Sequence, residues 1–213
     1  VCEKVPYKPD GEVKERDFTK VEKMFSLPNV LVLRLEKRDS FNRAVSSKYF
    51  AQNGIPKQLD LKQFNNDETC RFELVSYARW SGHAQGRDSG GHYTAGVKRN
   101  GKWYFMNDDR SPTPTGDPNR EDDRKKAMFF VYEKRQCETD PSKLNDLVDA
   151  QGESEPRGLP NTGNTCWFNS LMQALSSSKI FRDTLLAIEP SDVSSSLHRN
   201  FISALQKLVR YLY

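Results

Sequence analysis

The feature that most constrains the fold is a two-residue turn, Asn100-Gly101, between two segments that have strand-forming sequences. Asn-Gly suits a type I′ turn because both of its residues tolerate positive φ. The segment before it, 95–98, alternates in polarity, and the segment after it, 102–106, is aromatic. We therefore expect a β-hairpin here, within a sheet whose neighbouring strands run antiparallel.

Three other segments indicate strands of the same sheet. Residues 29–35 are apolar and β-branched, residues 71–78 alternate in polarity, and residues 127–132 are aromatic and β-branched. Before the last of these, residues 112–123 are rich in Pro and Asp, which predicts a polar loop of low order. We interpret residues 1–137 as a β-rich half.

The rest of the chain changes character twice. Residues 138–157 are acidic, polar and interrupted by Pro and Gly, which is typical of a linker. Residues 158–213 have two stretches with apolar residues at helical spacing, and Trp167 and Met172 in the first stretch are expected in the core. The sequence thus predicts an α+β protein with a β-rich half, a linker and a helical half.

Composition narrows the function classes. The 213 residues include 33 basic and 29 acidic side chains, interspersed and giving a net charge of +4, so a nucleic-acid partner is not expected. No apolar stretch approaches the ~20 residues that span a bilayer, so no membrane association is expected. The four Cys are scattered without a Cys-x-x-Cys pair, which argues against a zinc site and favours an intracellular compartment, cytoplasmic or nuclear. We expect a monomer without metal or cofactor.

Cys166 stands where the sequence favours a reactive thiolate. Cys166 follows a run of Gly, Asn and Thr and precedes an apolar-periodic segment, so it is expected in the first turn of a helix capped by Thr165 or Asn164. The free N–H groups and the helix dipole at that position stabilise a thiolate and an oxyanion. A nucleophile and a small buried structural cysteine are equally compatible with this segment alone.

A cysteine nucleophile needs a base, and the chain has three histidines. His92 lies in Gly-Gly-His-Tyr, just before a hairpin strand, whereas His83 lies in a Gly-rich polar loop and His198 in a helical segment. If the hairpin strands pair, Asn107 at the end of the second strand comes within hydrogen-bond reach of His92. Asn107 would then orient the imidazole, which favours an enzyme over a structural cysteine.

Two distant segments together carry a family pattern. Residues 158–173, Gly-Leu-Pro-Asn-Thr-Gly-Asn-Thr-Cys-Trp-Phe-Asn-Ser-Leu-Met-Gln, closely resemble the Cys box of the ubiquitin-specific proteases. Residues 89–94 and 103–108 resemble their His box. Shorter matches to the family lie at 27–38, 55–61 and 129–135. The resemblance implies a papain-like cysteine peptidase fold, with an antiparallel β palm and a helical thumb.

The resemblance also implies an activity and residue roles. Such enzymes cleave the isopeptide bond after the C-terminal glycine of ubiquitin or of a ubiquitin-like modifier. By position, Cys166 would be the nucleophile, His92 the general base and Asn107 the orienting residue, a role that Asp108 could share. Asn161 would donate to the oxyanion. The expected substrate contacts are Gly91, Tyr93, Trp80 and Trp167.

The order of the two boxes departs from the family. The family's Cys box comes first, whereas here it follows the His box, so residues 138–157 would join the old C-terminus to the old N-terminus in a circular permutation. The zinc-binding fingers, with their paired Cys-x-x-Cys, are missing, and Cys2 is at most one remnant of them. We expect the active site in the cleft between the two halves. A permuted, fingerless form suits either a trimmed eukaryotic enzyme or a pathogen effector that acts in host cytosol.

Two other functions stay open at this point. The first is a catalytically weak or inactive relative that binds ubiquitin without cutting it, and the retention of Cys166, His92 and Asn107 argues against it. The second is an acyltransferase or transglutaminase-like enzyme, which would use the same three residues but pass the acyl group to an amine.

Overall fold

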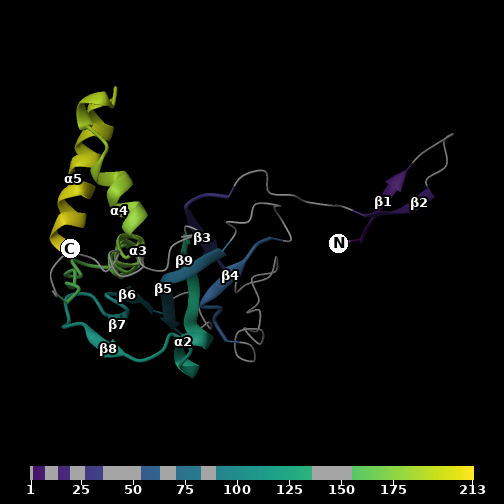
Figure 1. Ribbon diagram of the computed structural model, residues 1–213, viewed down its shortest axis with the longest axis horizontal. Helices are drawn as coiled ribbons and strands as arrows, with labels where there is room; N and C mark the ends of the chain where they lie inside the picture. The colour runs from purple at the N-terminus through teal and green to yellow at the C-terminus, as the bar shows by residue number, and fades with distance from the viewer. Residues whose placement is uncertain are drawn as a thin grey trace, which may run out of the picture.

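The computed structural model sets an antiparallel sheet beside a group of helices (Figure 1). It describes residues 27–35, 54–62, 71–82, 90–135 and 155–213, and the backbone of two further strands at 2–7 and 14–19. These two strands, β1 (Cys2–Tyr7) and β2 (Lys14–Thr19), pair antiparallel with each other.

The main sheet contains seven of the described strands, in the order β3-β9-β5-β6-β7-β8, with β4 paired to β5. Every neighbouring pair runs antiparallel. The bounds are β3 (Val30–Arg34), β4 (Gln58–Asp60), β5 (Arg71–Gly82), β6 (Gly91–Arg99), β7 (Lys102–Met106), β8 (Thr113–Thr115) and β9 (Ala127–Lys134). The five segments expected to be strands are all strands of this sheet.

The predicted hairpin is confirmed, and its turn has the expected backbone. Asn100 and Gly101 have φ values of 48° and 73°, both in the left-handed region. The register pairs Ala95 with Met106, so the start of β6 and the end of β7 lie at the same edge of the hairpin. This edge carries His92 and, one residue beyond β7, Asn107.

The polar loop predicted at 112–123 is wrong, because this segment is ordered. It contains β8 and leads into a short helix, α2 (Glu121–Lys126). Acidic residues in the first turn of α2 and basic residues in its last turn complement the helix dipole. Asp123 is fully buried and accepts hydrogen bonds from Arg79 and Arg120, so a charged residue here is a core residue with partners.

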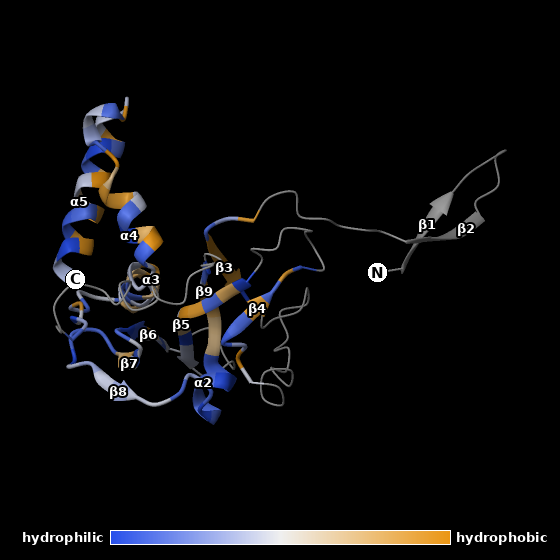
Figure 2. Cartoon of the chain, viewed as in Figure 1, coloured by the Kyte–Doolittle hydropathy of each residue, from blue (hydrophilic) through white to orange (hydrophobic). Residues whose placement is uncertain are grey.

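The C-terminal part of the chain is helical, as predicted. It contains α3 (Cys166–Ser176), α4 (Lys179–Leu186), a 3-10 turn η2 (Pro190–Asp192) and α5 (Ser196–Leu212). A small apolar core joins these elements and consists of Leu159, Met172, Leu185, Val209 and Leu212. In Figure 2 the apolar residues form orange patches on otherwise mostly blue helices, as expected for surface helices that bury one face.

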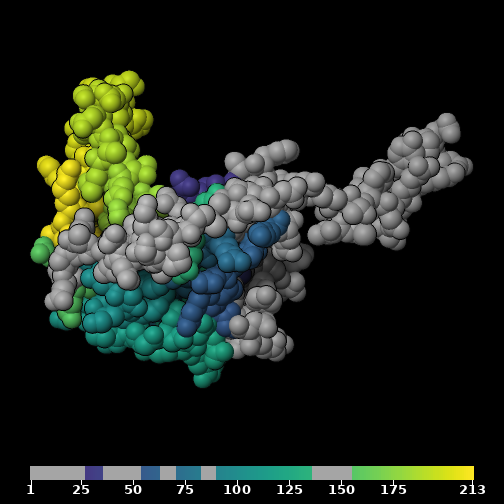
Figure 3. Space-filling view, in the orientation of Figure 1, coloured from purple at the N-terminus to yellow at the C-terminus, as the bar shows by residue number. Residues whose placement is uncertain are grey.

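Helix α3 joins the two parts of the molecule, whereas α4 and α5 rise from the sheet as a separate column (Figure 3). The hydroxyl of Ser76 on β5 donates to the carbonyl oxygen of Ala174 at 2.6 Å. The placement of Trp167 in the core was wrong, because its exposed fraction is 55%. Met172 is buried as expected.

Some expectations fall outside the part of the chain that the structure describes. The predicted linker, 138–157, is described only from residue 155, and His83 is not described. Within the described ranges, no helix is both long enough and apolar enough to cross a membrane.

Candidate active site

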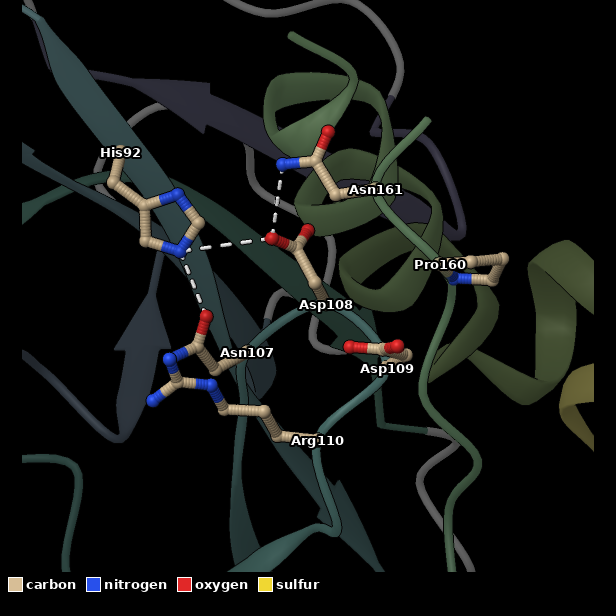
Figure 4. A pocket seen from close by; sticks show the side chains of 7 residues that line it. All are labelled: His92, Asn107, Asp108, Asp109, Arg110, Pro160 and Asn161. Atoms are coloured by element: carbon tan, nitrogen blue, oxygen red, sulfur yellow. Dashed lines mark hydrogen bonds and ion pairs between the residues drawn. The ribbon is translucent and has the colours of Figure 1, made fainter. Parts of the chain in front are cut away.

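A cavity of about 460 Å³ lies where three segments meet: the start of β6, the turn after β7 and the chain that leads into α3. Figure 4 shows the side chains around it. The residues that line it are His92, Asn107, Asp108, Asp109, Arg110, Pro160 and Asn161. Both sequence boxes therefore contribute to one site, although they are separated by more than fifty residues in the chain.

The imidazole of His92 is held by Asn107. Its Nε2 lies 2.7 Å from Asn107 Oδ1, so the contact expected from the hairpin register is confirmed. An amide oxygen can only accept, so Nε2 carries the proton in this contact and Nδ1 is left as the basic nitrogen. The geometry thus leaves Nδ1 of His92 available for a thiol.

Asp108 lies at the centre of the polar contacts. Its φ of 49° is in the left-handed region, which turns its carboxylate back toward the helical part. Oδ2 accepts from Asn161 Nδ2 at 3.1 Å and lies 3.8 Å from His92 Nε2. Oδ1 accepts from Asn169 Nδ2 at 2.9 Å. Only 12% of this side chain is exposed, so its hydrogen bonds to protein groups replace most of its hydration.

The backbone of the Cys box also docks on Asp108. The N–H of Leu159 donates to the Asp108 carbonyl oxygen at 2.8 Å. Gly158 lies so close that a Cβ built on it would be 2.4 Å from that same oxygen. Glycine at position 158 is therefore required by the close approach of the two boxes.

The side chain of Asn161 has partners on both sides of its amide. Its Oδ1 accepts from the N–H groups of Gly163 and Thr165 and from the Thr165 hydroxyl, at 3.1–3.2 Å. Its Nδ2 donates to Asp108. Thr165 does occupy the N-cap position of α3, but its hydroxyl makes no capping bond, so the predicted capping mechanism is wrong. The hydroxyl instead donates to the Asn161 side chain.

Cys166 is the first residue of α3 and is 8% exposed. It is a free thiol, and its position at a helix N-terminus is the one expected from the sequence. Within the described ranges, no hydrogen bond joins Cys166 to His92, and Cys166 does not line the cavity. Catalytic hydrogen bonds commonly tighten only when substrate is bound.

The four expected substrate contacts lie outside the cavity lining. Trp80 pairs with Tyr93 across β5 and β6, and its indole covers two glycines, since a Cβ on Gly91 would be 2.1 Å from Trp80 Nε1. The absence of a side chain at Gly91 is therefore explained by the packing of Trp80. Trp167 is exposed and makes an edge-to-face contact with Phe168, with ring centroids 5.8 Å apart.

Sequence reasoning missed two buried amides on α3, Asn169 and Gln173. Asn169 donates to Asp108 and to the carbonyl oxygens of Leu159 and Pro160 at 3.2 Å, and Gln173 donates to the Arg157 carbonyl oxygen at 2.6 Å. They are four residues apart and share a helix face. The available signal was this pair of amides at i, i+4 spacing on an otherwise apolar helix, since buried amides require partners.

No group of three or more potential metal ligands occurs among the residues that the structure describes. The functional groups in and beside the cavity are a thiol, an imidazole, two carboxamides and a carboxylate. Such a set can activate a nucleophile, orient the base and bind an oxyanion.

Comparison with known proteins identifies relatives. The chain is 35% identical over 149 residues to ubiquitin carboxyl-terminal hydrolase 15 of Bos taurus, which covers 67% of this chain and 15% of the relative. The human counterpart gives the same identity over 14% of its length. Ubiquitin carboxyl-terminal hydrolase 4 of Mus musculus is 36% identical over 98 residues, or 45% of this chain and 10% of the relative. The matched region thus spans 10 to 15% of these relatives.

Solved structures give weaker likenesses. The Ubp8-Sgf11-Sgf73-Sus1 SAGA DUB module matches with a TM-score of 0.41 and 22% identity, over 63% of this chain and 29% of the other. A form of that module bound to monoubiquitin matches with a TM-score of 0.39 and 21% identity, over 64% of this chain and 30% of the other.

The family profile described as "Ubiquitin carboxyl-terminal hydrolase" matches residues 1–132 and 157–213, and the chain therefore belongs to the ubiquitin carboxyl-terminal hydrolase family.

Proposed function

We propose that this chain is a thiol-dependent hydrolase with a papain-like catalytic centre, which removes ubiquitin or a ubiquitin-like modifier from its conjugates. The observation that carries the proposal is the 2.7 Å contact between His92 Nε2 and Asn107 Oδ1. In a member of the ubiquitin carboxyl-terminal hydrolase family, a base oriented in this way needs a thiol at its other nitrogen. Cys166, at the N-terminus of the helix that packs on β6, is the candidate.

In the first step, the Cys166 thiol transfers its proton to His92 Nδ1, and the thiolate attacks the carbonyl carbon of the modifier's terminal glycine. A C–S bond forms and the oxygen becomes an oxyanion. The intermediate collapses, the C–N bond to the lysine breaks, and His92 gives its proton to the departing amine.

In the second step, His92 takes a proton from water, and the resulting hydroxide attacks the thioester carbon. The C–S bond breaks, and the thiolate takes the proton back from His92. The products are the lysine amine, the modifier with a C-terminal carboxylic acid, and the regenerated enzyme, and the acid then passes its proton through water to the amine. Asn161 and the backbone N–H of Cys166 are the proposed donors to the oxyanion in both steps.

We further propose that the chain is a circularly permuted form of the family's domain that lacks the zinc-binding fingers. The order of the boxes supports the permutation, because the segment with the Cys box comes after the segment with the His box. The proposed partners are conjugates of ubiquitin or a ubiquitin-like protein. The proposed site of action is the cell interior, since the four scattered cysteines form no dense disulfide framework in the sequence.

A second candidate function is a catalytically weak or inactive protein that binds ubiquitin. One observation favours it: Cys166 and His92 are not hydrogen-bonded to each other within the described structure. An inactive protein would bind ubiquitin and form no covalent intermediate.

The test is to incubate the purified chain with ubiquitin that carries a C-terminal thiol-reactive group, with Cys166→Ala as the control. A covalent adduct that is absent from the variant supports the hydrolase. Binding of ubiquitin without an adduct supports the inactive relative. Neither binding nor adduct, with ubiquitin or with any ubiquitin-like modifier, would refute both candidates. Adding a free amine to the reaction distinguishes acyl transfer from hydrolysis by its product.

A further inference from the structure

Asn169 does not line the cavity, but it bonds to Asp108, which does. It lies one turn after Cys166 on the buried face of α3 and is 6% exposed. Its Nδ2 has three acceptors within 3.2 Å: the Asp108 carboxylate and two carbonyl oxygens of the chain that enters α3. Among these, the bond to Asp108 is the shortest, at 2.9 Å, and it is charge-assisted.

This bond decides where the Asp108 carboxylate points. Asn169 holds Oδ1, which leaves Oδ2 to accept from Asn161 Nδ2 at 3.1 Å, with His92 Nε2 further off at 3.8 Å. Without the donor on Oδ1, a mostly buried carboxylate would lack one of its partners and could turn toward the His92 ring. Oδ2 thus bonds to the Asn161 amide and stays beyond hydrogen-bond distance of His92 Nε2.

Asp108 is one of four partners that orient the Asn161 amide, and it is the one that bonds to the NH₂ group. Three donors face Asn161 Oδ1 and one carboxylate oxygen faces its Nδ2. Turning the amide over would set its NH₂ against three donors and its oxygen against a carboxylate, so a single orientation is allowed. In that orientation one N–H is bonded to Asp108 and the second N–H remains for another acceptor.

We propose that Asn169 is a positioning residue for the reaction, acting through Asp108 to fix the Asn161 amide with its second N–H available to the oxyanion. The inference rests on the proposed hydrolase function. Asn169 does not touch the substrate, and its effect reaches the reacting atoms only through the two intervening side chains.

The kinetic consequence is specific. A donor to the oxyanion acts in the transition state, so disturbing it lowers kcat and leaves KM nearly unchanged. Removing an oxyanion donor outright lowers kcat by about 10²–10³-fold. Releasing its support is a smaller change, and we expect Asn169→Ala to lower kcat by about 10- to 100-fold.

Gln173→Ala is the matched control. Gln173 is also a buried amide on α3, one turn further along, and it donates at 2.6 Å to the Arg157 carbonyl oxygen in the same entering chain. Both substitutions remove a buried amide that ties α3 to this chain, so both should lower Tm. Only Asn169→Ala should lower kcat on a ubiquitin C-terminal amide substrate. An equal loss of kcat in both variants would overturn the proposal, because the effect would then be general destabilisation.

A double substitution tests the route through Asn161. If Asn169 acts through that amide, Asn161→Ala combined with Asn169→Ala should be no slower than Asn161→Ala alone. Losses of kcat that multiply would show that the two residues act independently, and the proposal would be wrong.

A readout without turnover separates this inference from the proposed function. The side-chain NH₂ signals of Asn161 can be followed by ¹⁵N NMR and assigned by their loss in Asn161→Asp. Their exchange with solvent should be faster in Asn169→Ala than in wild type, and unchanged in Gln173→Ala. Unchanged exchange in Asn169→Ala overturns the positioning role. An inactive wild-type protein that shows the expected exchange pattern overturns the hydrolase and leaves the orientation of Asn161 by Asn169 supported.

Discussion

Two of the junctions between the helical part of the molecule and the sheet are built differently. At the candidate site the junction is polar, and its contacts converge on the Asp108 carboxylate and its backbone. At the far end of α5 the junction is aromatic and cationic: the guanidinium groups of Arg99 and Arg182 lie 4.1 and 4.0 Å from the ring centroid of Tyr213. Each arginine also donates to backbone carbonyl oxygens of the helical part, Arg99 to that of Leu212.

The first junction fixes the directions of side chains, whereas the second mainly holds the two parts of the molecule together. Hydrogen bonds between short side chains fix angles, so the junction at Asp108 suits a place where an amide and an imidazole must point in set directions. Stacking of buried cations on a ring contributes through contact area and desolvated charge, with less demand on angle. We therefore expect changes at the first junction to act mainly on turnover, and changes at the second to act mainly on stability.

The largest expected effect is on turnover alone. Cys166→Ala should lower the hydrolysis rate by at least about 10⁴-fold, because the reaction then lacks its nucleophile. Its Tm should stay close to that of wild type, since alanine fits the site of a small, nearly buried thiol at a helix start. The rate is measured with a ubiquitin C-terminal amide and the Tm by calorimetry. Retained turnover would mean that another residue is the nucleophile.

The converse effect is expected at the other junction. Tyr213→Ala removes the ring on which Arg99 and Arg182 stack, and we expect it to lower the free energy of unfolding by about 3 kcal/mol. Turnover per folded molecule should be unchanged well below the Tm. Urea unfolding and steady-state kinetics on the same sample measure both quantities. A fall in kcat without a fall in stability would contradict the expectation that the second junction acts on stability and the first on turnover.

Part of the site could be predicted from local sequence patterns. The Asn100-Gly101 turn fixes the register of its hairpin, and the register alone brings His92 and Asn107 to one edge. Such relations depend on turn chemistry and on the alternation of side chains, which act between near neighbours. Cys166 at a helix start follows in the same way from the residues before it.

The rest depends on contacts between distant segments. Asn169 reads as an ordinary helix residue until Asp108, 61 residues away, is placed beside it. Arg99 and Tyr213 read as surface residues, yet Arg99 bonds to a carbonyl oxygen 113 residues away. The short helix α2 was missed because its charged residues look solvated, whereas Asp123 is buried against Arg79 and Arg120. In each case a partner remote in sequence decides whether a polar residue is buried.

A smaller effect is expected at Gly158, where the backbone of the Cys box contacts the backbone of Asp108. Gly158→Ala would bring a Cβ to 2.4 Å from the Asp108 carbonyl oxygen, so the two segments must move apart. We expect a loss of about 1–3 kcal/mol in stability and a lower kcat, because Asp108 moves with its backbone. Gly116→Ala is the control, since a Cβ there meets nothing within 4 Å. Equal effects of the two substitutions would mean that the close approach at Gly158 is not required.

The smallest expected effect is on the pH dependence of stability, and it tests whether water reaches the second junction. Burial raises the pKa of Tyr213, as it does the pKa values of Tyr77 and Tyr132 in the sheet core. Because the folded state keeps these phenols neutral, their contribution to stability is complete below about pH 10 and is lost as pH rises further. Urea unfolding at pH 9 and pH 11 measures the total loss of stability between the two pH values.

Tyr213→Phe and Tyr77→Phe should each reduce this loss by a similar amount. That result would mean that the second junction excludes water as the sheet core does. If Tyr213→Phe leaves the loss unchanged while Tyr77→Phe reduces it, the stacked arginines and the ring are open to solvent, and the second junction would have to be described as a surface contact.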